Sequence, residues 1–430
     1  MIQSIIKPEK QQWQSLCKRP GIKAIDLNEL TNQIFKDIER NGDKAVKKYT
    51  NLFDETNSDR IKLTQEDIAQ GVAEVPADLQ RAIELAKSNI EKFHIAQKEE
   101  KNVIETTKGV SCWRESRAIE RIGIYIPGGS APLFSTVLML AVPAQIAGCK
   151  EIVLCTPPDK SGKINSAILY AAQLAGVTNI CSIGGIQAIA AMALGTETVT
   201  KVDKIFGPGN QYVTAAKQMA LQYGIAIDLP AGPSELLVIA DNNANAEYVA
   251  ADLLSQAEHG QDSQVVLLST DETILSDTLR AINDQIISLP RKEIAQKALQ
   301  NSKMILLNTL DECIAFSNFY APEHLILAIE DPDKYTGLII NAGSVFLGNY
   351  SCESAGDYAS GTNHTLPTNG YAKSYSGVSL DSFIKKITFQ KITARGLQNI
   401  GPSITIMAKA EQLEAHSNAV TIRLKDLANV

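Results

Sequence analysis

Residues 122–149 read IGIYIPGGSAPLFSTVLMLAVPAQIAGC, a stretch without a charged side chain that decides the fold class. It starts with strand-forming residues, passes through a Pro-Gly-Gly turn at Pro127 and ends in an apolar run of helical length. A run this long could suggest a membrane span, but Pro132, Pro143 and several hydroxyl and amide side chains interrupt it. We therefore expect a buried strand, a turn and a helix, and no membrane contact.

Short strand-like runs alternate with helical runs beyond this stretch. Strands are predicted at 122–126, 151–155, 179–183 and 204–206, and helices at 137–147, 166–175, 187–193 and 211–223. A second series follows residue 234, with strands at 236–240, 264–269 and 304–307 and helices at 246–257 and 276–287. This alternation is typical of parallel sheets that helices cover on both faces.

The predicted fold class is α/β, with two Rossmann-like parallel-sheet domains, incomplete and without Gly-x-Gly-x-x-Gly, plus small N-terminal and C-terminal helical extensions. Two domains suit 430 residues, because a single core seldom exceeds about 300 residues. Residues 25–100 show mostly helical spacing, with a capping box at Thr64 and Asp67. The chain ends in a β segment at 387–392 and helices at 408–416 and 419–427, which are too short to fold alone.

Composition and charge exclude several classes of protein. A hydrophobic fraction of 44% with 21% charged residues rules out a disordered, collagenous or coiled-coil chain. A net charge of -7 without a long Lys/Arg block argues against nucleic acid as a partner. Glu9 and Lys10 do not fit a signal peptide, so we expect a cytoplasmic protein. The seven cysteines form no Cys-x-x-Cys pair, which excludes a zinc ribbon, and we expect Cys112 and Cys149 to be inert.

Three glycine-rich turns each follow a predicted strand and precede a predicted helix. They are Tyr125-Ile-Pro-Gly-Gly-Ser130, Gly184-Gly-Ile-Gln187 and Phe206-Gly-Pro-Gly-Asn210. Such turns bind phosphate or other anions through free N–H groups, and ligands of open α/β sheets bind along this edge. None of the three fits the dinucleotide fingerprint, because Tyr212 stands where the third glycine would be.

Four of the five histidines lie in polar settings that suit a metal or acid–base site. His94 lies in a charged helix, and we expect it at the surface. The other four are His259, His324, His364 and His416. Gln256 and His259 would share a helix face, but glutamine is a poor zinc ligand. From residue types alone, the predicted zinc set is therefore His259, Asp357 and His364.

Glu323-His324 could combine a carboxylate that activates water with an imidazole that exchanges protons near neutral pH. The alternative is structural, because Pro322-Glu323 also suits the first turn of a helix. The sequence leaves both interpretations open at this point.

Taken together, these segments make the chain similar to the histidinol dehydrogenase family. The matching stretches begin at Tyr125, Phe206, Ala231 (AGPSE), Asp252 (DLLSQAEHG), Ala321 (APEH), Ser354 (SAGDYASGTNH) and Glu414 (EAH). The resemblance covers nearly the whole chain. The first twenty or so residues and the loop 159–165 carry none of these motifs.

The resemblance implies a different metal set from the one that residue types favour. Zinc, one ion per subunit, would be held by Gln256, His259, Asp357 and His416. The substrate would contact these four ligands and also Ser234, His324, His364 and Glu411. The NAD site would include Tyr125, Gln187 and Asn210, and Glu323 and His324 would be catalytic. Members are homodimers with exchanged C-terminal segments, so His416 and Glu411 would complete the active site of the partner.

The resemblance also implies the reaction and the roles of the domains. L-Histidinol would be oxidised to L-histidine through a bound aldehyde with two NAD, in the last steps of histidine biosynthesis. Residues 22–121 and 234–378 would carry the zinc and catalytic groups, and residues 122–233 would bind NAD. Residues 1–21 would form the N-terminal extension and residues 379–430 the swapped segment. Three alternatives remain, namely oxidation of another small alcohol, a zinc hydrolase without nicotinamide, and a binding module without catalysis.

Overall fold

The computed structural model describes residues 2–20, 27–54, 60–128, 131–229 and 232–428. The chain divides into two compact units, of which the first combines Met1–Ala96 with Glu120–Ser382. The second combines Gln97–Ile119 with Phe383–Val430. Within the described ranges, no helix combines the length and apolar composition needed to cross a membrane.

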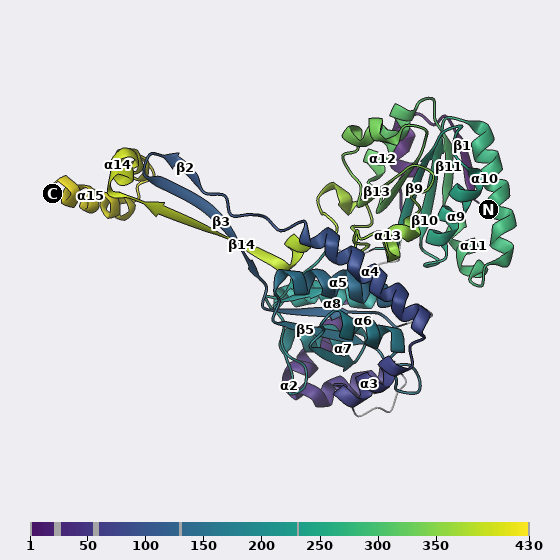
Figure 1. Cartoon of the computed structure of the whole chain (residues 1–430), viewed down its shortest axis with the longest axis horizontal. Coiled ribbons are helices and arrows are strands. Elements are labelled where there is room, and N and C mark those ends of the chain that lie inside the picture. The colour runs from purple at the N-terminus through teal and green to yellow at the C-terminus, as the bar shows by residue number, and fades with distance from the viewer. Residues whose placement is uncertain (1, 21–26, 55–59, 129–130, 230–231, 429–430) are drawn as a thin grey trace. The chain divides into compact units, whose positions relative to one another are not determined.

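A five-stranded parallel sheet in the first unit has the order β6-β5-β4-β7-β8. Its strands are β4 (Arg121–Tyr125), β5 (Glu151–Thr156), β6 (Asn179–Ser182), β7 (Lys204–Phe206) and β8 (Ala226–Ile227). The helices between them are α5 (Phe134–Ala147), α6 (Ser166–Leu174), α7 (Gly185–Leu194) and α8 (Gln211–Gln222). Figure 1 labels strand β5 of this sheet among the helices α5, α6, α7 and α8. The strand and the helix predicted in the stretch 122–149 are confirmed as β4 and α5, and residues 129–130 of the predicted turn lie outside the described residues.

A six-stranded parallel sheet in the same unit has the order β1-β11-β10-β9-β12-β13. Its strands are β1 (Gln3–Ile6), β9 (Glu235–Ala240), β10 (Gln264–Ser269), β11 (Lys303–Leu306), β12 (His324–Ala328) and β13 (Ser344–Leu347). Its helices are α9 (Ala246–Ala257), α10 (Glu272–Gln285), α11 (Lys292–Gln300), α12 (Leu310–Tyr320) and α13 (Glu353–Tyr358). Separate apolar cores lie on its two faces, so the two-sheet α/β prediction is confirmed.

The N-terminal part differs from the expected helical extension in one respect. Strand β1 pairs with β11 at the edge of the six-stranded sheet, and a 3-10 helix (Lys10–Gln12) and the short α1 (Trp13–Leu16) follow it. Strand β1 is not among the strands predicted from the sequence. An edge strand of four residues with a single ladder gives little periodic signal.

Between α1 and β2, the described part of the chain forms three further α-helices: α2 (Asn28–Phe53), α3 (Gln65–Ala73) and α4 (Ala77–Ile95). Thr64 caps α3 with the capping box that the sequence predicted. His94 on α4 is fully buried, however, so its predicted surface position is wrong. It follows Ala86 and Ile90 at intervals of four residues, and its Nδ1 lies 2.7 Å from the Ile90 carbonyl oxygen.

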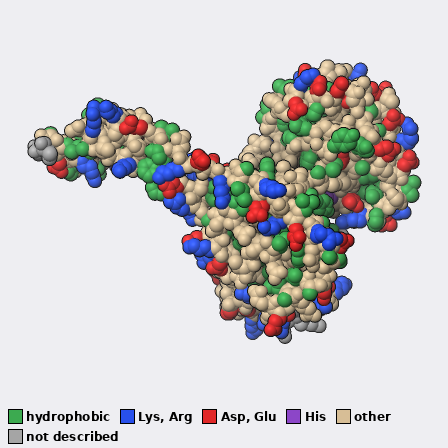
Figure 2. Space-filling view, in the orientation of Figure 1, with side chains coloured by type: hydrophobic (Ala, Val, Ile, Leu, Met, Phe, Trp, Pro, Cys, Tyr) green, Lys and Arg blue, Asp and Glu red, His purple; other side chains and the backbone are tan. Residues whose placement is uncertain are grey.

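The second unit is an antiparallel sheet, order β14-β3-β2, with two helices. Its elements are β2 (Ile104–Thr107), β3 (Val110–Ala118), β14 (Ile384–Ile392), α14 (Ala394–Ala410) and α15 (Glu414–Ala428). The helix predicted at 408–416 is wrong, because α14 ends at Ala410 and Gln412 has a positive φ of 60°. Hydrophobic side chains lie exposed among Lys and Arg on this unit (Figure 2).

Candidate active site

One cavity of the first unit gathers most of the site residues that the sequence predicted. Its lining includes Ser234, Gln256, His259, Glu323, His324, Asp357 and His364. Gly207 and Pro208, from the turn after β7, belong to the same lining. The cavity therefore joins groups from the six-stranded sheet to a glycine-rich turn of the five-stranded sheet.

The candidate metal ligands come from two helix termini. Gln256 lies in the last turn of α9, and His259 follows it in the turn that ends the helix. Asp357 lies on α13, and its Oδ2 is 3.9 Å from His259 Nε2. Among the described residues, neither amide atom of the buried Gln256 has a hydrogen-bond partner. A buried amide without partners is costly, and a metal ion beside it would satisfy its oxygen.

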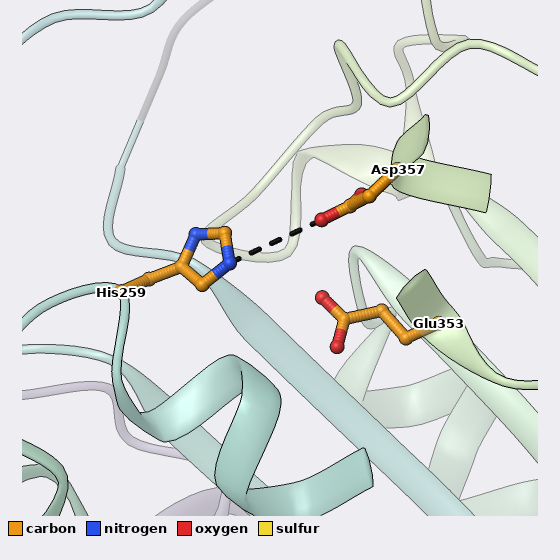
Figure 3. A group of neighbouring side chains, drawn as sticks. All are labelled: His259, Glu353 and Asp357. Atoms are coloured by element: carbon orange, nitrogen blue, oxygen red, sulfur yellow. Dashed lines mark ion pairs between the residues drawn. The ribbon is translucent and has the colours of Figure 1, made fainter. Parts of the chain in front are cut away.

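Glu353 belongs to this cluster, although the sequence analysis did not single it out. The ligand atoms of His259, Glu353 and Asp357 lie within 4.8 Å of one another, and Figure 3 shows the three side chains converging. Burial raises the pKa of Glu353 to about 7. Its Oε2 accepts a hydrogen bond from Ser255 Oγ at 2.5 Å. The spacing of four residues to Asp357 was the signal that could have identified it.

Glu323 directly precedes β12 and His324 is its first residue, so the alternative of a helix start at Pro322 is wrong. Glu323 Oε2 accepts the main-chain N–H of Glu235 at 2.8 Å, and His324 Nδ1 lies 3.2 Å from the Glu235 carbonyl oxygen. His324 Nε2 is 3.7 Å from Asp357 Oδ1. The pair is thus held by one main-chain residue and faces the candidate metal ligands.

Burial and neighbouring charges set the pKa values of the pair. Burial raises the pKa of Glu323 to about 8, against the lowering effect of His324. Burial by itself lowers the pKa of His324, but the charges of Glu323 and Asp357 outweigh it and raise that pKa to about 10. A cation bound at Asp357 would oppose this stabilisation of the imidazolium and lower the His324 pKa.

His364 links the two sheets at the cavity. Its Nε2 lies 3.0 Å from Thr136 Oγ1 on α5, and its Nδ1 lies 2.8 Å from the Asp357 carbonyl oxygen. Burial lowers the pKa of His364, which favours a neutral ring. The sequence analysis did not name Thr136 as a site residue, although it lies in the quoted stretch.

The residues expected at the NAD site lie at the carboxyl edge of the five-stranded sheet, where Tyr125 ends β4 and Gln187 lies in the first turn of α7. The hydroxyl of Tyr125 accepts the Gly185 N–H at 3.1 Å, which joins the end of β4 to the start of α7. Gln187 Nε2 donates to Asp54 at 3.4 Å, and its buried Oε1 has no partner among the described residues. Asn210 caps α8. Tyr125, Gln187 and Asn210 are not among the described residues that line the cavity.

Glu411 and His416 belong to the second unit and are exposed there. The described residues that line the cavity all come from the first unit. The roles expected for these two residues therefore stay predictions.

Comparisons with known proteins confirm the family resemblance. A sequence profile described as histidinol dehydrogenase matches residues 17–424. The chain is 56% identical to histidinol dehydrogenase of Bacteroides fragilis, covering 98% of both chains, and 57% identical to that of Bacteroides thetaiotaomicron, covering 99% and 100%. The crystal structure of histidinol dehydrogenase from Elizabethkingia anophelis matches with a TM-score of 0.98 and 64% identity, covering 99% of both chains. This chain belongs to the histidinol dehydrogenase family.

Proposed function

We propose that this protein oxidises L-histidinol to L-histidine through a bound aldehyde, with zinc in the site and two NAD as acceptors. The observation that carries this proposal is the single cavity in which Gln256, His259 and Asp357 face Glu323 and His324. The pathway would be the last steps of histidine biosynthesis. Action in the cytoplasm stays a prediction from the sequence.

Zinc would be held by Gln256, His259 and Asp357, with His416 supplied by the other subunit. The amide of Gln256, buried without partners among the described residues, supports this choice. Bound zinc would supply a template that fixes the amine and the imidazole of histidinol. Ser234 and His364, which line the same cavity, are proposed to contact the substrate together with Glu411 of the partner subunit.

NAD, when bound, would supply the hydride acceptor. Tyr125, Gln187 and Asn210 are the residues proposed to hold it, and the partnerless Gln187 Oε1 fits a hydrogen-bond donor of a ligand. At Gly207, φ is 121° and an added Cβ would overlap the Tyr125 carbonyl oxygen, so this turn admits only glycine. Such close backbone packing suits a turn that a nucleotide approaches.

His324 is proposed to move the proton at the substrate hydroxyl. If its Nδ1–H donates to the Glu235 carbonyl, the lone pair of Nε2 is left to accept that proton. Glu323 would take a proton from the water that hydrates the aldehyde. With a pKa of about 8, its carboxyl group can exchange protons near neutral pH. His324 would act again as the base in the second oxidation.

A homodimer with exchanged C-terminal segments is part of the proposal. Among the described residues of the second unit, the buried hydrophobic side chains are only Val110, Phe383 and Ala408. Many others are exposed, among them Ile387, Ile392, Ile406, Met407 and Ile422. A unit with so small a core needs a partner surface, and the second subunit is the partner that we propose.

The first experiment measures NADH formed from limiting L-histidinol and excess NAD, before and after chelation and zinc restoration. Two NADH per histidinol, lost on chelation and regained with zinc, are expected. No NADH despite stoichiometric bound metal would contradict the proposal. Other small alcohols would then be tested first, and hydrolase substrates second.

A further inference from the structure

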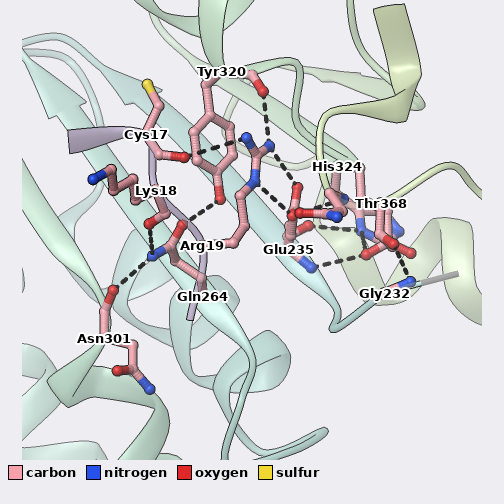
Figure 4. Close-up of polar contacts among 12 residues, drawn as sticks. Cys17, Lys18, Arg19, Gly232, Glu235, Gln264, Asn301, Tyr320, His324 and Thr368 are labelled. Carbon is pink, nitrogen blue, oxygen red and sulfur yellow. Dashed lines mark hydrogen bonds and ion pairs between the residues drawn. The ribbon is translucent and has the colours of Figure 1, made fainter. Parts of the chain in front are cut away.

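We propose that Arg19, in the N-terminal segment, is a positioning residue for the acid–base pair Glu323 and His324. The proposal rests on the function proposed above for that pair. It concerns the contacts shown in Figure 4, where the guanidinium group of Arg19 lies between Glu235 and Tyr320. Neither Arg19 nor these two residues are among the described residues that line the cavity, so Arg19 would act through the main chain.

The first step is the clamp that Arg19 forms on Glu235. Its Nε and Nη2 donate to the two carboxylate oxygens of Glu235 at 2.8 and 3.0 Å. The side chains are 14% and 1% exposed, so water competes little for these bonds. The main-chain N–H of Asn369 donates to the same carboxylate at 2.8 Å. The Glu235 side chain is therefore fixed from two sides.

The second step concerns the main chain of Glu235, which contacts both members of the acid–base pair. Its N–H donates to Glu323, and its carbonyl oxygen faces His324 Nδ1. A shift of the Glu235 main chain would move the contacts of the Glu323 carboxylate and the His324 imidazole together. Clamping the Glu235 side chain therefore fixes the orientation of both proposed catalytic groups.

The third step is the turn that leads into the pair. Arg19 Nη2 also donates to the Tyr320 carbonyl oxygen at 2.7 Å, and the guanidinium carbon lies 3.8 Å from the Tyr320 ring centroid. Tyr320 ends α12, and Ala321 follows with a positive φ of 56°. Arg19 thus binds both the residue that faces the pair and the strained turn that precedes it.

The N-terminal segment is itself anchored to the sheet. The Tyr320 hydroxyl donates to Gln264 at 2.8 Å, and Gln264 Nε2 donates to the carbonyl oxygens of Lys18 and Asn301. The Arg19 guanidinium also donates to the Cys17 carbonyl oxygen at 3.4 Å, and lysine at position 19 could keep the charge but not the planar fork that meets these four acceptors. A displacement of about 1 Å at a catalytic group can cost about 100-fold in rate.

The test compares Arg19→Ala and Arg19→Lys with the wild type in the full-length protein. Arg19→Ala should lower kcat by about 10- to 100-fold, while KM and the calorimetric Kd for histidinol stay within about threefold. Arg19→Lys should lower kcat by a smaller factor than Arg19→Ala. Added guanidinium ion, kept below denaturing concentration, should restore part of kcat in Arg19→Ala only. The control is Leu275→Ala, a core substitution on α10 that should lower Tm without lowering kcat.

Three outcomes would overturn the role of Arg19: wild-type kcat in both variants, a change confined to KM, or the same kcat loss in a Leu275→Ala protein of matching Tm. If Arg19→Ala fails to fold, Arg19→Lys decides alone, and an unchanged kcat there contradicts the proposal. A wild-type protein that forms no NADH from histidinol would instead refute the proposed function.

Discussion

Replacing Lys217 by Met should destabilise the first unit and weaken NAD binding, because the Lys217 side chain binds the main chain of the turn at Gly207. Lys217 and Asp228 form an ion pair whose side chains are 5% and 2% exposed. Lys217 Nζ also donates to the Gly207 carbonyl oxygen at 2.9 Å, and Asp228 Oδ2 accepts the Gly207 N–H at 2.8 Å. Both main-chain groups of Gly207 are therefore held by this pair.

The expected loss in the free energy of unfolding depends on the hydrogen bonds that Asp228 keeps after the substitution. Removing one partner of a buried ion pair costs about 3–5 kcal/mol. Asp228 keeps the N–H groups of Gly207 and Leu229 in Lys217→Met, which favours the lower end, about 3 kcal/mol. For a unit as large as the first one, that corresponds to a fall in Tm of about 4 °C. Converting Asp228 to Asn in the same chain removes the buried charge and should recover part of the loss.

The assay is thermal unfolding together with a titration of NAD. We expect the NAD Kd of Lys217→Met to rise by about tenfold, because the turn loses its support. Lys150→Met is the matched control, since it breaks an exposed ion pair with Glu120 and should leave Tm and Kd unchanged. A wild-type Tm in Lys217→Met, or a double variant no more stable than the single one, would refute the reasoning.

Further predictions concern the metal, the pair and pH. His416→Ala should lose zinc and activity. A mixture of His416→Ala and His324→Ala proteins should regain activity, because each mixed dimer contains one intact site. A His416→Ala protein that binds stoichiometric zinc with normal affinity would contradict the ligand role of His416. Glu323→Gln should slow the second, water-consuming oxidation. Single-turnover data in which only the first oxidation is slower would contradict the role of Glu323 in activating water. Burial raises the Asp252 pKa from 3.8 to about 6, so the stability that its proton confers is lost as pH rises through 6. The free energy of unfolding of Asp252→Asn should therefore rise relative to that of the wild type by about 1.4 kcal/mol between about pH 5 and pH 8 in urea unfolding. The same difference between the two proteins at both pH values would count against this cause.

Much of the fold could be predicted because both parallel sheets are covered on both faces. Their strands are continuous apolar runs, and α9 and β10 have the predicted bounds. The prediction failed where local composition and burial disagree. His94 follows Lys92 in a charged helix, yet it continues the buried stripe of Ile83 and Ile90. The charged neighbours of His94 favoured a surface position, whereas helical spacing alone would have predicted that His94 is buried.

The candidate site could be predicted only where its residues stand in motifs. Glu323, His324 and Asp357 lie in matching stretches, and the structure brings them to one cavity. The contact between Arg19 and Glu235 joins residues 216 positions apart. No periodicity or spacing rule reaches that far, so the support of the site had to come from the structure.

Gln256 is a candidate zinc ligand although zinc sites rarely use glutamine. Residue type alone excluded it from the zinc set, yet its amide is buried beside His259 and Asp357 with no partner among the described residues. A ligand that binds only the folded chain stabilises it, by about 2.7 kcal/mol at 100 times its Kd. Zinc should therefore raise the Tm of chelated wild-type protein, and Gln256→Ala should need more zinc for the same rise. Equal zinc dependence of Tm in both proteins would remove Gln256 from the metal site, whether or not the enzyme turns over.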